Sequence, residues 1–210
     1  MNDKAIKPIS WVWKSLEEIA ADGAPILYGI LQPGPDIPNG IPYVRPTEIV
    51  GDVIDLASIR RTTPAIGAKY KRSTLKHNDI ILSIVGTIGK VAIVPAELEG
   101  GNITQSSVRI RVCPEVALPA YVAWALRSPI LRRQYDTHRL GTAVPRLNVA
   151  HVRALRVPIP PLSEQKRIVT ELEQRLSLIA ALESALSANL QRTTRLRSAI
   201  LQKEFNSALQ

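Results

Sequence analysis

The last quarter of the sequence, residues 162–210, most constrains what this chain can fold into. Apolar residues recur there at a mean spacing of 3.5, covering 28 residues in eight steps, and Thr193 is the one polar member. This period keeps one stripe of a helix facing a partner helix, as in a coiled coil. The stripe, called the seam below, consists of Leu172, Leu176, Ile179, Leu182, Leu186, Leu190, Thr193, Leu196 and Ile200.

One uninterrupted helix is expected over this stretch. Pro160 and Pro161 end whatever structure precedes it, and neither Gly nor Pro follows as far as Gln210. At ~1.5 Å per residue, such a helix would extend about 65–70 Å, which exceeds the width of a small domain. The helix therefore needs a second helix to cover its seam.

The preceding residues, 1–161, have the usual size of one globular domain. The whole chain is 45% hydrophobic, which leaves ample material for a core. We therefore predict an α+β fold: a globular domain of mixed helices and strands, residues 1–161, followed by one long coiled-coil-forming helix, residues 162–210.

The globular part carries most of the positive charge. The chain has 27 Lys and Arg against 18 Asp and Glu, a formal net charge of +9, and only seven of these cations and five of these acids follow Leu162. Residues 1–162 therefore hold 20 cations and 13 acids, a surplus of +7. Such a surplus favours a polyanion such as nucleic acid as partner, although many basic proteins bind no polyanion.

Cysteine usage and hydropathy indicate a soluble, cytoplasmic protein. Cys113 is the single cysteine, which excludes a disulfide within one chain and suits a reducing compartment. The first residues lack the uninterrupted apolar core of a signal peptide, and no run approaches the ~20 apolar residues that a membrane helix needs.

Two segments concentrate the cations. Residues 60–76 contain six cations and no acid, and residues 127–153 contain six arginines with Asp136 as the one acid. Cations bind phosphates and nearby hydroxyls add directional hydrogen bonds, so these segments suit a nucleic-acid backbone; a solvated protein face is the alternative. The candidate DNA contacts chosen from them are Lys69, Lys71, Arg72, Arg139 and Arg146.

Polar side chains also interrupt the β-rich part of the chain. Residues 80–94 predict a hairpin that is broken by Gly86-Thr87-Ile88-Gly89. This break resembles a phosphate-binding loop only superficially, because two residues rather than four separate its glycines and a valine follows its lysine. Residues 104–107 place short polar side chains in a row, which can read base edges but is also common in turns. The candidate contacts here are Thr87, Lys90, Thr104 and Gln105.

Other stretches give local expectations. Residues 32–46 are too rich in Pro and Gly for regular structure and predict a long loop. Residues 108–112 alternate between apolar residues and arginines, which predicts a half-buried strand that turns Arg109 and Arg111 to solvent. Short helices are expected at about 118–126, 129–133 and 149–153, and a last strand at 155–159.

No catalytic constellation is recognisable in the sequence. His77, His138 and His151 have neither metal-ligand spacing nor a cysteine pair beside them, and no nucleophile elbow, Gly-rich cofactor fingerprint or acidic nuclease cluster occurs. A binding module without metal or cofactor is therefore favoured over an enzyme.

Three stretches resemble the specificity subunits of type I restriction-modification enzymes. Residues 78–94, NDIILSIVGTIGKVAIV, look like the central hairpin of that family, and residues 102–105, NITQ, look like the stretch after it. The most specific match is residues 141–169, GTAVPRLNVAHVRALRVPIPPLSEQKRIV, which opens the long helix. Together these stretches extend the resemblance over most of the chain.

The resemblance implies a non-catalytic subunit that recognises DNA. Full-length members have two target recognition domains, which read the two halves of an interrupted target in double-stranded DNA. Their two long helices pair antiparallel as a spacer and bind the methylation subunits, through which the restriction subunit joins. For this chain, the resemblance implies one target recognition domain, residues 1–161, and one such helix.

A single helix leaves the seam without an intramolecular partner. A two-fold homodimer would rebuild the pseudo-symmetric full-length subunit and would read an interrupted palindrome. Alternatively, the chain is the first half of a longer protein whose second helix covers the seam. Two readings of another class also stay open: a coiled-coil adaptor whose basic domain binds an acidic protein, and a methyltransferase or nuclease in its own right.

Overall fold

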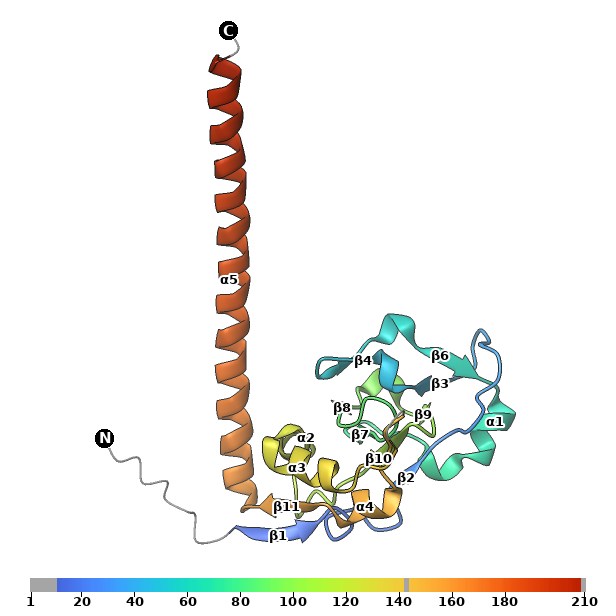
Figure 1. Ribbon diagram of the computed structural model, residues 1–210. Coiled ribbons are helices and arrows are strands. Elements are labelled where there is room, and N and C mark those ends of the chain that lie inside the picture. Colours follow the sequence, from blue (N-terminus) through green and yellow to red (C-terminus); the bar gives the residue numbers. More distant parts are fainter. Residues whose placement is uncertain (1–10, 142–143, 209–210) are drawn as a thin grey trace. The chain divides into compact units, whose positions relative to one another are not determined.

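The computed structural model describes residues 11–141 and 144–208, and it contains both strands and helices (Figure 1). The chain divides into two compact units, residues 1–166 and 167–210. The second unit is the part of helix α5 (Leu162–Ala208) that follows Lys166. This architecture confirms the predicted α+β fold with a long C-terminal helix. No helix among the described residues is both long and apolar enough to cross a bilayer.

The central sheet of the first unit has four antiparallel strands in the order β2-β10-β7-β8. Strands β7 (Ile80–Ser83) and β8 (Val91–Ile93) form the predicted hairpin, and β10 (Ser107–Ile110) lies between β7 and β2 (Leu27–Tyr28). Every residue of β7 and β10 is buried. Both faces of these two strands are therefore covered by the rest of the unit.

The prediction that Arg109 and Arg111 face solvent is wrong. Arg109 is 1% exposed, and its Nη2 donates to the carbonyl oxygens of Pro25 at 2.9 Å and Arg72 at 3.3 Å. Arg111 donates from Nε and Nη2 to the carboxylate of buried Asp79, at 2.7 Å each. The alternating pattern predicts one solvated face, but β10 is covered on both faces. Arg109 therefore hydrogen-bonds carbonyl oxygens inside the protein, and Arg111, just after the strand, pairs with a buried carboxylate.

A second sheet has three strands in the order β6-β3-β9. Its central strand β3 (Ile41–Val44) pairs antiparallel with β6 (Arg60–Thr62) and parallel with β9 (Asn102–Ile103). The prediction that all of residues 32–46 form a loop is therefore wrong at β3. Pro42 hides this strand in the sequence, but its fixed φ suits extended backbone, so the strand forms at the loss of one ladder donor.

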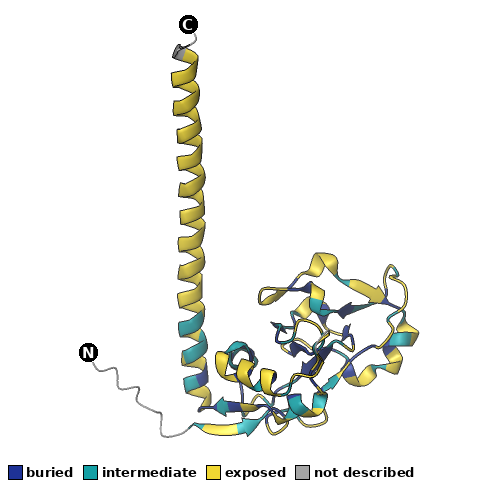
Figure 2. Cartoon of the chain, viewed as in Figure 1, coloured by how far each residue is buried: buried dark blue, intermediate teal, exposed yellow. Residues whose placement is uncertain are grey.

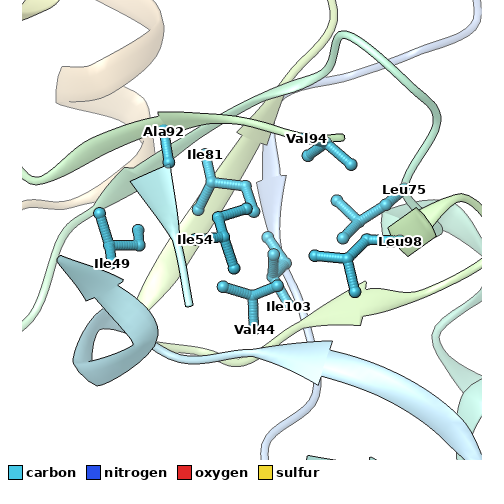
Figure 3. Packing of buried hydrophobic residues seen from close by; sticks show 9 residues of the cluster. All are labelled: Val44, Ile49, Ile54, Leu75, Ile81, Ala92, Val94, Leu98 and Ile103. Atoms are coloured by element: carbon cyan, nitrogen blue, oxygen red, sulfur yellow. The ribbon is translucent and has the colours of Figure 1, made fainter. Parts of the chain in front are cut away.

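The hydrophobic core joins the two sheets to a small hairpin, β4 (Ile49–Val50) with β5 (Val53–Ile54) (Figure 3). Ile81 from the central sheet and Ile103 from the second sheet are both fully buried in it. Burial of such a side chain contributes about 1.5–3 kcal/mol to folding. The core therefore anchors β7, β8 and β9, the strands that are followed or joined by the polar segments at 84–90 and 104–107. The cluster consists of Val44, Ile49, Ile54, Leu75, Ile81, Ala92, Val94, Leu98 and Ile103.

Two of the short helices begin where the sequence supplies a side-chain cap. Ser128 Oγ accepts a hydrogen bond from the amide of Leu131 at 3.4 Å, and Asn148 Oδ1 accepts one from the amide of Ala150 at 3.2 Å. Each cap satisfies an amide that the first turn leaves without a partner. The remaining elements of the first unit include α1 (Pro64–Lys69), α2 (Pro119–Arg127), α3 (Pro129–Thr137), α4 (Val149–Ala154) and the antiparallel pair of β1 (Val12–Ser15) with β11 (Arg156–Ile159).

The first turn of α5 belongs to the first unit through Gln165, which is fully buried. Its Oε1 accepts a hydrogen bond from the amide of Leu118 at 2.8 Å. Its Nε2 donates to the carbonyl oxygens of Val116 at 3.0 Å and Pro160 at 2.8 Å. The side-chain amide of Gln165 therefore connects the start of α5 to the backbone just before the helix, at Pro160, and to the backbone before α2, at Val116 and Leu118.

Beyond its first turns, α5 exposes its side chains (Figure 2). The apolar seam residues from Leu176 to Ile200 are 40–70% exposed. Thr193, the polar member of the seam, donates its hydroxyl to the carbonyl oxygen of Asn189 at 2.9 Å. The hydroxyl group therefore has its hydrogen-bond partner within the helix, and the methyl group remains available for apolar contacts along the seam. The helix carries a continuous apolar stripe that is open to solvent.

Candidate nucleic-acid interface

A groove of about 490 Å³, called the central groove below, collects four of the predicted DNA contacts. Thr87 and Lys90 come from the hairpin loop between β7 and β8, and Thr104 and Gln105 come from the segment after β9. The two segments are adjacent because Ile84 and Val85 donate from their amides to the carbonyl oxygen of Ser106. The groove is lined by Leu31, Pro33, Arg45, Pro46, Thr47, Val85, Gly86, Thr87, Lys90, Thr104, Gln105 and Ser106.

The hairpin loop presents Thr87 at an exposed position. Gly86 and Gly89 adopt φ of 74° and 88°, which glycine reaches without steric cost. Ser83 at the end of β7 holds the loop, because its Oγ donates to the carbonyl oxygen of Thr87 and accepts from the amide of Lys90. Two glycines and one serine therefore set the conformation, and the Thr87 side chain is not needed to maintain it.

Gln105 and Thr104 differ in how far they reach. The backbone of Gln105 is fixed by a hydrogen bond of 2.9 Å from its amide to the carbonyl oxygen of Ile30. Its side chain is exposed and has no hydrogen-bond partner among the described residues. Thr104 is only 7% exposed and forms part of the groove floor. Of the two, Gln105 has the freer amide for a base edge.

Lys90 lies in the groove, but its ammonium group already has partners. Its Nζ donates to the carbonyl oxygens of Pro46 at 2.9 Å and Ile49 at 2.8 Å. Pro46 is the first residue of the 3₁₀ turn η1 (Pro46–Glu48), and Ile49 follows this turn. With two of three donors used internally, Lys90 can offer one hydrogen bond to a ligand.

Arg45 also lines the groove, although it is not among the contacts predicted from the sequence. Its Nε donates to Glu48 Oε1 at 2.9 Å, and its Nη2 donates to the same oxygen. Hydrogen bonding to Glu48 raises the pKa of the Arg45 guanidinium. Thr47 adds a hydrogen bond from its hydroxyl to the same carboxylate at 2.8 Å. The only sequence signal was a lone Arg-Pro-Thr-Glu run in a proline-rich stretch.

A second groove, of about 360 Å³, shares Gly86 and Thr87 of the hairpin loop with the central groove and is also lined by Arg139. Thr87 lines both grooves, and Arg132 joins Arg139 in the second one. Arg146 lies nearby, because its backbone forms bridges with Val85 and Leu140. The side chains of Arg139 and Arg146 are exposed. The second basic cluster therefore contributes two predicted contacts beside the hairpin loop, together with Arg132, which the prediction omitted.

Other arginines of this cluster serve the fold. Arg127 Nη2 donates to the carbonyl oxygen of Val91 at 3.0 Å, and its Nε lies 2.9 Å from the carboxylate of Asp52. Arg153 donates from Nε and Nη2 to the carbonyl oxygen of Ile26 at 3.0 and 2.8 Å. The number of arginines in a segment therefore does not show which of them bind the protein itself and which are exposed for a ligand.

The remaining predicted contacts, Lys69, Lys71 and Arg72, form a separate cluster in α1 and the 3₁₀ turn that follows it. Their side chains are exposed and have no hydrogen bond or ion pair with described residues. Asn102 of β9 holds this turn, because its Nδ2 donates to the carbonyl oxygen of Tyr70 at 3.1 Å. None of the three lines the two grooves described above.

The titratable side chains do not assemble into a metal centre within residues 11–141 and 144–208. His138 and His151, which lie 13 positions apart, stack with their ring centroids 4.5 Å apart.

Comparison with known proteins covers nearly the whole chain. Residues 10–192 match the family model described as the type I restriction modification DNA specificity domain. The specificity subunit of the Type I restriction enzyme EcoBI from Escherichia coli is 31% identical over 208 residues. That alignment covers 99% of this chain and 44% of the EcoBI subunit, so the chain spans less than half the length of this relative.

Solved structures share the fold at lower sequence identity. A chain from a structure of the type I R-M system gives a TM-score of 0.73 at 20% identity, covering 97% of this chain and 47% of that one. The HsdS subunit from Thermoanaerobacter tengcongensis gives 0.66 at 23% identity, covering 90% and 47%. By its match to the family model and to the EcoBI subunit, this chain belongs to the family of type I restriction-modification DNA specificity domains.

Proposed function

We propose that this chain is a non-catalytic DNA-recognition subunit that reads one half of an interrupted target in double-stranded DNA. The observation that carries this proposal is the central groove, where Thr87 and Gln105 from two separate segments present exposed hydrogen-bonding groups beside two cations. Side chains of this kind read base edges, while the surrounding cations hold phosphates. The resemblance to the EcoBI subunit supports the same role.

The exposed seam supports an assembly role for α5. We infer that two copies of the chain pair through their helices, and that the paired helices dock the methylation subunits and, through them, the restriction subunit. A two-fold dimer would place two identical recognition domains on an interrupted palindrome. Such an assembly would act in the cytoplasm, and the chain would neither methylate nor cleave DNA by itself.

The decisive experiment is selection of duplexes from a random-sequence library by the purified chain, followed by fluorescence anisotropy with the selected and a scrambled duplex. The double variant Thr87→Ala, Gln105→Ala should lower the affinity for the selected duplex about 10-fold or more and leave the scrambled duplex nearly unaffected. Gln174→Ala, at an exposed position on α5, is the matched control.

The cluster of Lys69, Lys71 and Arg72 has a different expected signature, because these cations would contact phosphates. Arg72→Ala should weaken binding to every duplex. A plot of log affinity against log salt has a negative slope, and the variant should make that slope shallower by about 0.9. Anisotropy titrations at several salt concentrations measure this slope. An unchanged slope would remove Arg72 from the interface.

The rival function is a coiled-coil adaptor whose basic domain binds an acidic protein. It predicts equal affinity for all duplexes and no enriched sequence after selection. Incubation of the chain alone with DNA and a methyl donor, or with DNA and Mg²⁺, tests the enzymatic alternative, and methylated or cleaved product would refute the proposed non-catalytic role.

A further inference from the structure

Arg45, which lines the central groove, is held by a buried carboxylate. It follows β3, the central strand of its sheet, and precedes η1. Glu48, which is 2% exposed, accepts hydrogen bonds from the amide, Nε and Nη2 of Arg45. Because a buried carboxylate fixes both the backbone and the guanidinium of Arg45, the side chain has little freedom left to lose on binding.

The segment that carries Arg45 and Glu48 is itself fixed at both ends. Lys90 binds the carbonyl oxygens of Pro46 and Ile49 from across the groove. The carbonyl oxygen of Glu48 accepts a further hydrogen bond from the amide of Asp55 at 2.8 Å. Lys90 therefore holds this segment in place as well as lining the groove.

The outer edge of the Arg45 guanidinium is available. Nε–H and one hydrogen of Nη2 point to Glu48, so the second hydrogen of Nη2 and both hydrogens of Nη1 have no partner among the described residues. The side chain is 33% exposed and lines the groove with Thr87 and Gln105. A guanidinium edge with two parallel donors matches the O6 and N7 acceptors of guanine in the major groove.

We propose that Arg45 is the residue that reads a guanine in the central groove, and that Glu48 is its positioning residue. This inference rests on the proposed DNA-recognition function and deepens it by assigning one base contact.

A base contact fits Arg45 better than a phosphate contact. The buried carboxylate of Glu48 cancels the charge of Arg45, so the pair has little long-range attraction for the DNA backbone. The exposed cations Lys71 and Arg72, by contrast, have no acid beside them among the described residues. Arg45 should therefore contribute to sequence preference and hardly at all to the salt dependence of binding.

The test uses the full chain, the selected duplex, a scrambled duplex and a second round of library selection with each variant. Arg45→Ala removes the guanidinium. Arg45→Lys keeps the positive charge beside Glu48 but has no two-donor edge. Glu48→Gln keeps the arginine but loosens its support and frees its charge. Lys166→Ala, at an exposed cation that does not line the groove, controls for the loss of one charge, and thermal unfolding checks that each variant is folded.

Arg45→Ala and Arg45→Lys should both lower the affinity for the selected duplex about 5- to 100-fold. Their affinity for the scrambled duplex should change less than about twofold. The sequence that each variant selects should no longer specify one G·C pair that the wild type prefers. Glu48→Gln should reduce the ratio of the two affinities partly, through tighter binding to the scrambled duplex. The inference is overturned if the wild type selects a sequence and both Arg45 variants select the same one. A wild type that selects no sequence would instead overturn the proposed function itself.

Discussion

Arg109 is a buried cation without a carboxylate partner. Burial, and then the charge of Arg111, lowers the pKa of Arg109, and its contacts are two carbonyl oxygens. Arg109→Ala would leave those carbonyls unsatisfied and open a cavity, so we expect a loss of about 2–4 kcal/mol in the free energy of unfolding. Urea unfolding measures it, and exposed Arg133→Ala should stay within about 0.5 kcal/mol of wild type. Equal losses in the two variants would contradict a structural role for Arg109.

Tyr121 links stability to alkaline pH. Its hydroxyl donates to the carbonyl oxygen of Pro158 at 2.6 Å, and burial together with the negative charge of Glu164 raises its pKa to about 12. A tyrosine in the unfolded chain ionises near ~10, so the unfolded state releases its proton first. The contribution of Tyr121 is therefore complete below pH ~10 and is lost as pH rises through about 12.

Tyr121→Phe should accordingly cost about 1 kcal/mol of unfolding free energy at pH 7, through the lost hydrogen bond. Between pH 10 and 12 the deficit should shrink, because the variant has no proton to release. Urea unfolding of both proteins at pH 8–12 provides the comparison. A deficit that stays constant over this range would show that Tyr121 does not titrate differently in the two states.

Arg45 illustrates which part of the candidate site was hidden from the sequence. Thr87 and Gln105 were predictable because short polar runs between strands mark exposed turns. Arg45 was not predictable, because its orientation in the groove depends on buried Glu48 and on Lys90, which comes from a hairpin distant in the sequence. Burial and partners of this kind arise only when the sheets pack, so no local pattern in the chain reports them.

Among the elements, those with local signals were predicted well. The hairpin of β7 and β8, helices α2 to α4, strand β11 and helix α5 follow from turn glycines, caps and apolar period. Strand β3 was missed because its proline dominated the composition. Strand β10 was predicted, but one of its faces was wrongly predicted to be exposed to solvent. Alternation of apolar and polar residues does not show whether other parts of the fold cover the polar face. Proline composition therefore explains the error at β3, and tertiary packing explains the error at β10.

Helix α5 depends on Gln165 for its connection to the first unit. Its amide group makes three hydrogen bonds to backbone atoms and is fully buried. Gln165→Ala should therefore lower the free energy of unfolding of the first unit by about 2–3 kcal/mol. Gln174→Ala, exposed on the same helix, should have almost no effect in the same urea experiment. A matching loss in Gln174→Ala would mean that helix propensity, rather than these hydrogen bonds, is responsible.

For the molecule as a whole, the exposed seam makes oligomeric state the central question. One chain has a mass of 23.1 kDa, and we expect light scattering at micromolar concentration to give twice this value. The double variant Leu182→Lys, Leu186→Lys places two charges in the seam, where pairing would bury them, so it should give the mass of one chain. Glu183→Lys lies between them outside the seam and should remain dimeric. A monomeric wild type would contradict the homodimer and favour a longer protein whose second helix covers the seam.

Main-chain hydrogen bonds hold together the segments that line the central groove. Ser106 accepts from the amides of Ile84 and Val85, and Gln105 donates from its amide to Ile30. Exposed side chains on these segments, such as Thr87, can be exchanged within about 0.5 kcal/mol of stability. The side chain of Thr87 is thus separate from the main-chain atoms that hold these segments together. Under the proposed function, exchange of such a side chain would change the preferred target without a large loss of stability.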